Sequence, residues 1–375
     1  MKEKIITFFK KETILCISGV LAAFSACIIP PDGAYKGYCD IRVLTLLFCL
    51  MAVMGGLQQM GVFDRFASEL LSKAKNLRQL TTTLVMLCFF SAMLVTNDVA
   101  LITFVPFTIM LLQRANLTDR MIPIIVMQTI AANLGSMLTP VGNPQNLYLY
   151  TISGMSLGQF FGTTLHLTLF SFVLLMLFCL NQKQTPLAPP ETRGHIAYDT
   201  REKTFLGALA FLFGLCLLAV FRLMPYFWVL AVILLWFLLF QHGVLKKLDY
   251  CLLLTFVFFF VLIGNLGRIP MIREALQSLL LGREVLVSFC SSQFISNVPA
   301  AVLLSEFTDR YDLLIAGVNI GGLGTLIASM ASLISYKYFA QVPQAKKGRY
   351  LLHFTKMNVF FAAVLLCLNG LMIYS

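Results

Sequence analysis

Long apolar runs recur along the whole chain, and each is close to the roughly 20 residues that a helix needs to cross about 30 Å of hydrocarbon. Of the 375 residues, 59% are hydrophobic and 12% are charged. A soluble domain with this composition would expose far too much apolar surface. The longest polar stretch extends only from about Asn181 to Lys203. These observations predict an all-α polytopic membrane protein.

The apolar runs predict about nine full spans. The first follows a basic start, but it leads into Pro30-Pro31-Asp32 rather than a small-residue cleavage site, so we interpret it as a span and not a signal peptide. The predicted spans are 13–30, 41–60, 121–150, 157–181, 204–222, 225–241, 249–266, 312–341 and 351–374.

Two further segments are interrupted and are predicted to be re-entrant hairpins. Residues 79–113 carry one charge, Asp98, at their centre, and residues 284–307 are interrupted at Ser296-Asn297-Val298-Pro299. The second segment is also long enough for one ordinary span. That alternative would move five basic residues between 337 and 356 outside and weaken the positive-inside bias, so the hairpin is preferred. The N-terminus is then predicted in the cytoplasm and the C-terminus outside.

The chain also repeats its own features in the same order. Asp40 precedes Gly55-Gly56-Leu57 as Asp249 precedes Gly264-Asn265-Leu266, Asn97 and Asn297 occupy the hairpin tips, and Leu134-Gly135-Ser136 matches Leu323-Gly324-Thr325. An unpaired span between the halves predicts inverted-topology repeats, as in many alternating-access transporters. The predicted parts are a first repeat at 1–181 (scaffold 1–78, hairpin 79–113, broken helix 121–150), a cytoplasmic linker and connecting span at 182–224, and a second repeat at 225–375 (hairpin 284–307, broken helix 312–341).

The strongest local signal lies inside the span 121–150. Two prolines remove backbone donors, and glycine and asparagine favour turns, so a continuous helix is not expected there. Broken helices offer N–H groups to anions and freed carbonyls to cations. The alternative is a proline kink whose polar side chains bond the freed backbone. The candidate ligand residues are Thr139, Gly142, Asn143, Gln145 and Asn146.

The first hairpin tip, Thr96-Asn97-Asp98, places an acid between apolar arms. Such a residue costs about 2.5–3.5 kcal/mol on insertion scales and needs a partner or a function. Asp98 is a candidate to bind a coupling cation or to carry a proton. The alternative is that Asn97 and Asp98 only cap the second arm.

The second tip and its break are chemically different from the first. Ser296 and Asn297 form a tip without an acid, and the break offers hydroxyl groups from Thr325, Ser329 and Ser332. The alternative is that the small residues of 317–335 only allow close helix packing. The two halves are therefore related in order but unequal in chemistry.

Composition also excludes several functions. The net charge of +11 fits basic loops on one membrane face, so no nucleic-acid partner is expected. The ten cysteines are mostly single and the four histidines scattered, so neither a disulfide framework, a metal cluster nor a resident cofactor is predicted. An enzyme would need a nucleophile–base or metal cluster, and an ATP-driven pump a P-loop; neither pattern is present.

The tips and the first break resemble the ion transporter superfamily, which includes divalent anion:sodium symporters, citrate carriers, arsenite permeases and one type of sodium/proton antiporter. The resemblance covers essentially the whole chain and is strongest to the arsenite-permease-like branch and to bacterial anion permeases. It implies a scaffold, a mobile transport subdomain, elevator-like movement and often a homodimer. It places one substrate or coupling-ion site at Asn97 with the Gly142–Asn143 break, and another at Asn297 with the Thr325–Ser332 break.

One departure from the family pattern limits the substrate assignment. The dicarboxylate symporters carry Ser-Asn-Thr at both tips, whereas here the third positions are Asp98 and Val298. We therefore predict a secondary transporter of a small inorganic or organic anion or oxyacid in the cytoplasmic membrane, coupled to protons or to sodium held at Asn97, Asp98 and Asn297. The alternatives are a sodium/proton antiporter and, from another class, an ion channel, which would need a continuous polar path.

Overall fold

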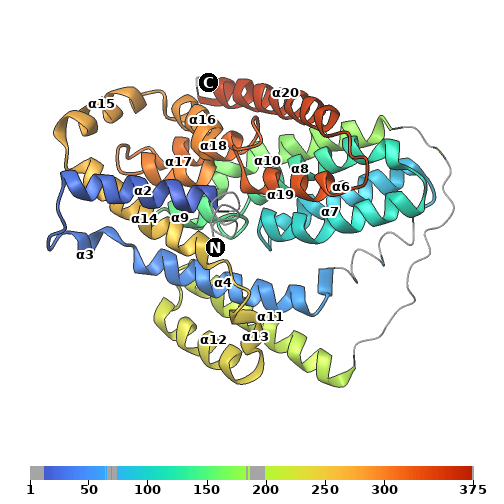
Figure 1. The fold of residues 1–375 in the computed structure, drawn as a ribbon, viewed down its shortest axis with the longest axis horizontal. Helices are drawn as coiled ribbons and strands as arrows, with labels where there is room; N and C mark the ends of the chain where they lie inside the picture. The colour runs from blue at the N-terminus through green and yellow to red at the C-terminus, as the bar shows by residue number, and fades with distance from the viewer. Residues whose placement is uncertain are drawn as a thin grey trace.

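The fold is a bundle of helices that follow the predicted spans in order (Figure 1). The computed structural model describes residues 12–63, 65, 69, 74–182, 185 and 199–373. The first-half helices are α2 (Thr13–Ile28), α3 (Tyr35–Tyr38), α4 (Ile41–Gln59), α6 (Leu77–Ala92), α7 (Asn97–Arg114), the short 3-10 helix η1 (Thr118–Arg120), α8 (Met121–Ser136), α9 (Pro144–Ser153) and α10 (Leu157–Leu180).

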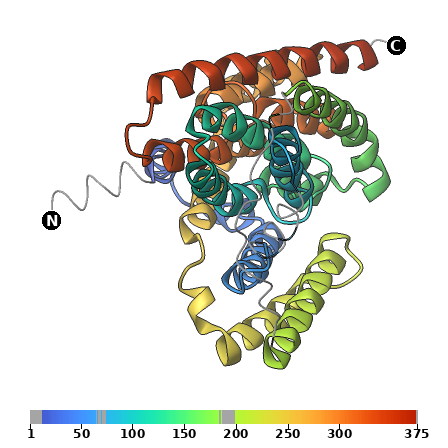
Figure 2. The ribbon, with the colours of Figure 1, turned by 90° about the vertical axis from the view of Figure 1, so that its right-hand side faces the viewer.

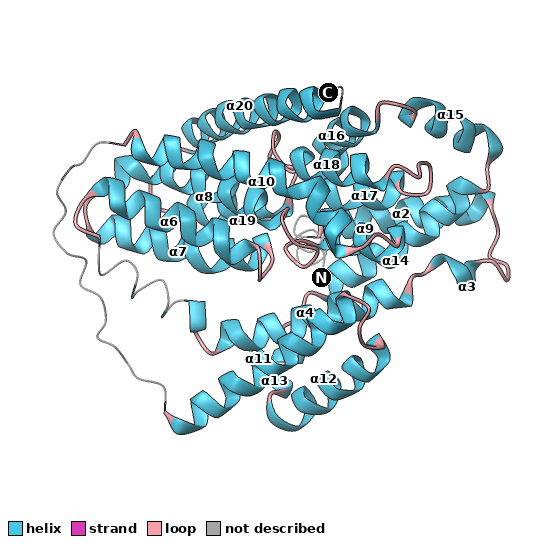
Figure 3. Cartoon of the chain, turned by 180° about the vertical axis from the view of Figure 1, so that it is seen from behind, coloured by secondary structure: helices cyan, strands magenta, loops and turns pink. Residues whose placement is uncertain are grey.

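The second half begins after the predicted linker, most of which lies outside the described residues. The predicted connecting span is α11 (Thr200–Val220), and the second repeat contains α12 (Tyr226–Phe240), α13 (His242–Leu245), α14 (Tyr250–Gly267), α15 (Pro270–Leu280), α16 (Glu284–Ile295), α17 (Asn297–Leu304), α18 (Tyr311–Gly321), α19 (Met330–Ala340) and α20 (Lys347–Ile373). Seen from behind, the described elements are helices joined by loops (Figure 3).

Five of the described helices are long and apolar enough to cross a membrane on their own: α4, α10, α11, α14 and α20. Five shorter apolar helices accompany them, and these include the first arm of each hairpin. The protein is therefore a multi-pass α-helical membrane protein, as predicted. The number of full spans and the re-entrant course of the hairpins stay predictions, because they depend on where the bilayer lies.

Both predicted broken helices are interrupted in the structure. The first stops at Ser136 and resumes at Pro144, and the second stops at Gly321 and resumes at Met330. The second hairpin turns at Ser296, whose φ of 74° is the left-handed conformation that a helix cannot contain. Helices α16 and α17 pack against each other and against α18, so this segment is two short arms rather than one straight helix.

The two halves repeat one element order and exchange equivalent contacts. Helix α6 packs against α8 as α16 packs against α18, and each resumed helix packs against the hairpin of the other half: α9 against α17 and α19 against α7. Asp40 and Asp249 cap α4 and α14 by accepting the backbone N–H of Val43 and Leu252. These relations support an internal repeat, while its inverted orientation in the membrane stays a prediction.

The repeat register at the breaks differs from the one that the sequence suggests. A Cβ on Gly135 would lie 2.0 Å from the carbonyl oxygen of Phe89, and a Cβ on Gly321 would lie 3.3 Å from the Cα of Phe289. Phe89 and Phe289 are equivalent arm residues, so Gly135 corresponds to Gly321 and not to Gly324. The sequence match was displaced by three residues because the second break begins with several glycines in close succession.

Apolar packing divides the helices into two cores. The first contains buried residues of α6, α7, α8, α10, α19 and α20. The second contains those of α4, α11, α12 and α14 together with α9, α17 and most of the buried α18 residues. Turning the molecule shows α11 and α12 below α4, with α20 lying across the opposite side (Figure 2). The breaks and hairpin tips lie where the two cores meet.

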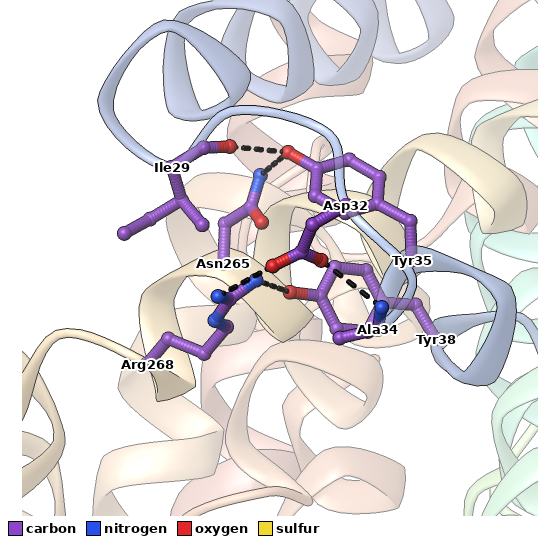
Figure 4. Close-up of polar contacts among 7 residues, drawn as sticks. All are labelled: Ile29, Asp32, Ala34, Tyr35, Tyr38, Asn265 and Arg268. Carbon is purple, nitrogen blue, oxygen red and sulfur yellow. Dashed lines mark hydrogen bonds and ion pairs between the residues drawn. The ribbon is translucent and has the colours of Figure 1, made fainter.

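A polar cluster fastens the loop after α2 to the end of α14 (Figure 4). Arg268 donates to Asp32 at 2.8 Å and to the Tyr38 hydroxyl at 3.1 Å. Asn265 donates to the Tyr35 hydroxyl at 2.8 Å. The Arg268 hydrogen bond holds the pKa of the Asp32 carboxyl below its ordinary value. The cluster fixes the relative position of α2 and α14.

Candidate functional site

Each hairpin tip is bound to the break of its own half through its asparagine backbone. The N–H of Asn97 donates to the carbonyl of Gly142 at 3.1 Å, and the N–H of Asn297 donates to the carbonyl of Ala328 at 2.9 Å. In the first half, the Thr139 hydroxyl also donates to the carbonyl of Met93 at the hairpin turn. Tip and break therefore form one polar unit in each half.

An asparagine of α8, Asn133, links the first tip to the second break. Its Oδ1 accepts from Asn97 Nδ2 at 3.0 Å and from the Ser329 hydroxyl at 3.1 Å. Its Nδ2 donates to the carbonyl of Gly322 at 3.3 Å. Asn133 is 4% exposed, so water does not replace these partners in this arrangement. It connects predicted site residues from both repeats.

The equivalent asparagine of α18, Asn319, links the second half to the first break. Its Nδ2 donates to Asn146 Oδ1 at 2.7 Å and to the carbonyl of Ile315 at 2.8 Å. Its Oδ1 accepts from Asn143 Nδ2 at 3.3 Å. Asn133 and Asn319 thus make reciprocal bonds, since each contacts the residue that precedes the resumed helix of the opposite half.

Both linking asparagines were missed in the sequence. Asn133 lies ten residues before Asn143, and Asn319 lies ten residues before Ser329. The signal that identifies them is the repeated Asn133-Leu134-Gly135 and Asn319-Ile320-Gly321, an uncharged polar residue ahead of the glycine that packs against the hairpin arm. The sequence match pairs Gly135 with Gly324 instead of Gly321, and in that alignment the two asparagines are not equivalent.

Different side chains satisfy the carbonyls that the breaks leave free. In the first half, Asn146 Nδ2 donates to the carbonyls of Ser136, Met137 and Thr139 at 3.2–3.4 Å. Asn146 therefore bonds the freed backbone, which is the role that the proline-kink alternative gives to the polar side chains of this break. In the second half, Gln293 on α16 donates to the carbonyls at the end of α18 and just beyond it, 3.0 and 2.9 Å away.

Thr325 does not join the central network. Its hydroxyl donates to the backbone carbonyl of Gln293 at 2.9 Å, and the residue is exposed. Partial exposure is found at Thr96, Asp98 and Thr139. The other predicted site residues are buried: Asn97, Gly142, Asn143, Gln145, Asn146, Ser296, Asn297, Ser329 and Ser332. Hydrogen bonds to the linking asparagines join Asn97, Asn143, Asn146 and Ser329, and Thr325 lies outside this network.

Helix capping differs between the halves. Thr96 caps α7 by accepting from the Val99 N–H at 3.4 Å, and Asn143 caps α9 by accepting from the Asn146 N–H at 2.9 Å. Asn97 adds to this cap, because its Oδ1 accepts the backbone N–H of Asp98 at 2.9 Å, so the capping considered for the first tip is shared by Thr96 and Asn97. In the second half, neither Ser296 before α17 nor Ser329 before α19 makes a side-chain cap bond. The positive ends of α17 and α19 are therefore left without side-chain caps.

A hydroxyl without a partner lies in the first turn of α19. Ser332 is fully buried, and its Oγ has no hydrogen-bond partner among the described residues. Asn297 lies on the other uncapped helix and is 4% exposed. Hydroxyl and amide donors beside positive helix ends are the groups that bind an anion.

Asp98 presents the opposite chemistry at the first tip. Its Oδ1 is buried and has no hydrogen-bond partner in the described part of the chain. A carboxylate oxygen that is buried without a partner is stabilised by a proton or a bound cation. The described residues contain no group of three or more His, Cys, Asp or Glu able to hold a metal ion.

Comparison with known proteins assigns the family. Residues 5–311 match the family model described as citrate transporter. The chain belongs to the citrate transporter family. An uncharacterised transporter of Methanocaldococcus jannaschii is 33% identical over 314 residues, which cover 83% of this chain and 84% of that protein. Inner membrane protein YbiR of Escherichia coli is 28% identical over 336 residues, 86% of each chain.

A third relative matches over part of its length. The silicon efflux transporter LSI3 of rice is 31% identical over 159 residues, which cover 42% of this chain and 32% of that protein. The predicted resemblance to the ion transporter superfamily is confirmed by the family match. This member of the citrate transporter family is a secondary transporter and a multi-pass membrane protein, and both its family and its Methanocaldococcus jannaschii relative are described as transporters rather than enzymes.

Proposed function

We propose that the protein moves a small inorganic or organic anion or oxyacid across the cytoplasmic membrane in exchange for, or together with, protons or sodium. The anion binds at the uncapped ends of α17 and α19, and the coupling ion binds at Asp98. The observation that carries the proposal is the buried, unpartnered Ser332 hydroxyl in the first turn of α19, a helix that, like α17, has no side-chain cap at its N-terminus.

The anion site draws on two sources of favourable interaction. Backbone N–H groups at a helix N-terminus carry a positive partial charge and point toward a ligand. Ser332 and Asn297 add donors from side chains that are already buried, so little ordering cost is added on binding. In the first half, Thr96 and Asn143 occupy the corresponding backbone donors, which directs the anion to the second half.

The coupling site rests on the unsatisfied Asp98 carboxylate. Because its buried Oδ1 has no partner among the described residues, Asp98 is more stable when a proton or sodium ion is bound than when it is bare. Binding of the cation then reduces the negative charge close to the central network. That reduction favours entry of an anion and ties the two binding events together.

The substrate class is a small anion, with citrate as one member to be tested because of the family description. The partial likeness to a silicon efflux transporter adds oxyacids to the set. The match to an Escherichia coli inner membrane protein supports a cytoplasmic-membrane location. The homodimer implied by the superfamily resemblance remains part of the proposal.

An elevator-like movement requires a contact that can release. Tyr148 on α9 lies against Phe256 and Phe260 of α14, with ring centroids 6.2 and 5.8 Å apart, and its hydroxyl is 2.8 Å from the Ser305 hydroxyl just after α17. We propose that this aromatic contact separates from α14 while the tip–break bonds stay intact. The central network then moves with the hairpins.

The anion site is tested by ligand-induced thermal shifts of the purified protein. A panel of citrate, smaller carboxylates, phosphate, arsenite and silicate is measured with sodium and pH varied. We expect the ion that stabilises the wild type to lose most of its shift in Ser332→Ala. Ser171→Ala is the matched control, because Ser171 is equally buried but bonds its own helix carbonyl at Leu167. Equal shifts in both variants would contradict the anion site.

A sodium/proton antiporter is the second candidate, favoured by the buried carboxylate oxygen of Asp98 that has no partner among the described residues. In that function, sodium gradients drive proton movement in proteoliposomes without any anion present. A flux that needs an anion on one side supports the anion transporter instead. Asp98 is essential in both functions, so this measurement, rather than mutation of Asp98, separates them.

A further inference from the structure

A cavity of about 770 Å³ lies away from the central site, between the α9–α10 loop, the first part of α10, the start of α18 and the end of α20. None of the hairpin-tip or break residues line it. Its polar lining includes His166, Asp309, Asp312 and Asn369. Nothing in the transport proposal uses these four side chains.

Two buried polar atoms in this lining lack partners. Asn369 is 5% exposed, and its Nδ2 donor has no hydrogen-bond partner among the described residues. His166 Nε2 is likewise buried without a partner, while Nδ1 lies 3.3 Å from the carbonyl of Gly162. Because that carbonyl can only accept, Nδ1 carries the proton of the neutral ring and Nε2 is an acceptor. Each of these two cavity-lining residues thus has a side-chain donor or acceptor that no described protein atom uses.

The charge of the lining is negative. Among the described residues that line it, Asp309 and Asp312 carry charge, and none is a lysine or arginine. Asp312 is paired with Arg310 at 3.1 Å, whereas Asp309 has no ion pair in the described structure. A ligand in this cavity therefore carries a positive group toward Asp309 and accepts a hydrogen bond from Asn369.

The surroundings of the cavity are apolar and exposed. Leu165 and Leu169 on α10 are 44% and 56% exposed, and Leu371 on α20 is 73% exposed. In a multi-pass membrane protein, such residues on spanning helices face acyl chains. Leu165 and Leu371 lie next in sequence to the lining residues His166 and Met372. A polar cavity bordered by lipid-facing side chains suits a ligand with a polar head and an apolar tail.

We propose that this cavity binds the headgroup of a phospholipid with a primary ammonium group, the chemistry of phosphatidylethanolamine. The ammonium has three N–H donors, for which Asp309 and His166 Nε2 are acceptors. A phosphate oxygen accepts from Asn369 Nδ2, and the acyl chains lie along α10 and α20. A headgroup without N–H donors loses these bonds, and an anionic headgroup without an ammonium is repelled by the carboxylates.

The test compares three lipids with identical acyl chains on the delipidated full-length protein, by native mass spectrometry and thermal shift. Phosphatidylethanolamine is expected to bind at least tenfold more tightly than phosphatidylcholine or phosphatidylglycerol. Asp309→Asn should remove most of that preference, and Asn369→Ala should weaken binding of phosphatidylethanolamine. Asp119→Asn is the control, an exposed carboxylate of η1 outside the cavity whose loss should leave lipid binding unchanged.

Several outcomes would overturn the proposal. Equal binding of the three lipids, or no binding of any, contradicts ammonium recognition. An unchanged preference in Asp309→Asn contradicts the placement of the ammonium, and this exposed loop variant is expected to fold normally. Phosphoethanolamine, the soluble headgroup alone, should bind far more weakly than the lipid; equal binding would mean that the site serves a soluble amine instead.

Discussion

Asn133 offers the sharpest test of the central network. Replacing it with alanine removes three hydrogen bonds at once: from Asn97 Nδ2, from the Ser329 hydroxyl and to the carbonyl of Gly322. Asn97 and Ser329 are 4% and 1% exposed, so they find no water in exchange within this arrangement. The variant therefore separates the first tip from the second break without touching either directly.

The expected loss follows from the number of bonds. Interhelical hydrogen bonds within membrane proteins contribute about 0.6 kcal/mol each on average. Three such bonds give about 2 kcal/mol, which shifts the folding equilibrium roughly 30-fold. Asn97 Nδ2 and the Ser329 hydroxyl would be left without this acceptor. If both stay buried and unpaired, each adds about 1–3 kcal/mol to the loss of folding free energy.

The assay is thermal unfolding of purified Asn133→Ala, with substrate-driven flux measured in parallel. Asn358→Ala is the matched control, because Asn358 is equally buried on α20 but donates only to the Phe354 carbonyl of its own helix. We expect a clearly lower Tm and lost flux for Asn133→Ala and a small change for Asn358→Ala. A double-mutant cycle on Asn133 and Ser329 measures their coupling. The double variant should lose less folding free energy than the sum of the two single variants, by about 0.6–1.7 kcal/mol. Equal behaviour of the two alanine variants would refute the reasoning.

Three further changes have distinct expected results. Asp98→Asn should leave uptake unresponsive to imposed proton or sodium gradients, and an unchanged ion dependence would remove Asp98 from coupling. Gly142→Ala should lower the Tm strongly, because the added Cβ would lie 2.1 Å from the carbonyl oxygen of Ser136 at the end of α8. Gly162→Ala is the control, since its Cβ would meet nothing within 4 Å and the Tm should not change. Because Arg268 lowers the pKa of Asp32, the stability from that pair is present above the free Asp pKa of about 4 and lost as pH falls below it. The Tm of Asp32→Asn should therefore fall less than that of the wild type below about pH 4; parallel curves would contradict the ion pair's contribution.

The sequence predicted the helices because their causes are local. The length of the apolar runs predicts the spans, and the structure adds that Asp40, Asp249 and Asn143 cap α4, α14 and α9. The predicted range 41–60 corresponds to Ile41–Gln59, and 157–181 to Leu157–Leu180. Hairpin tips and breaks were also predictable, since prolines, glycines and polar residues inside apolar runs interrupt helices at those positions.

The network inside the site was not predictable, because it depends on contacts between distant segments. Asn133 and Asn319 belong to otherwise unremarkable apolar helices, and only the packing of α8 and α18 brings them to the opposite breaks. Thr325 looked like a ligand in the sequence, yet Gln293 on the hairpin arm holds it away from the centre. The difference in capping between the halves depends on side-chain geometry that the same residue types do not reveal.

Tracer uptake in proteoliposomes tests the central claim most directly. The substrate is the anion that stabilises the wild type, and the wild type is compared with Ser332→Ala and Asp98→Asn under imposed proton and sodium gradients. We predict that the wild type accumulates the anion above its equilibrium level. Uptake by Ser332→Ala should no longer saturate at low substrate concentration, and uptake by Asp98→Asn should no longer depend on the imposed gradient. Gradient-independent conductance, or equal uptake by all three proteins, would contradict the account.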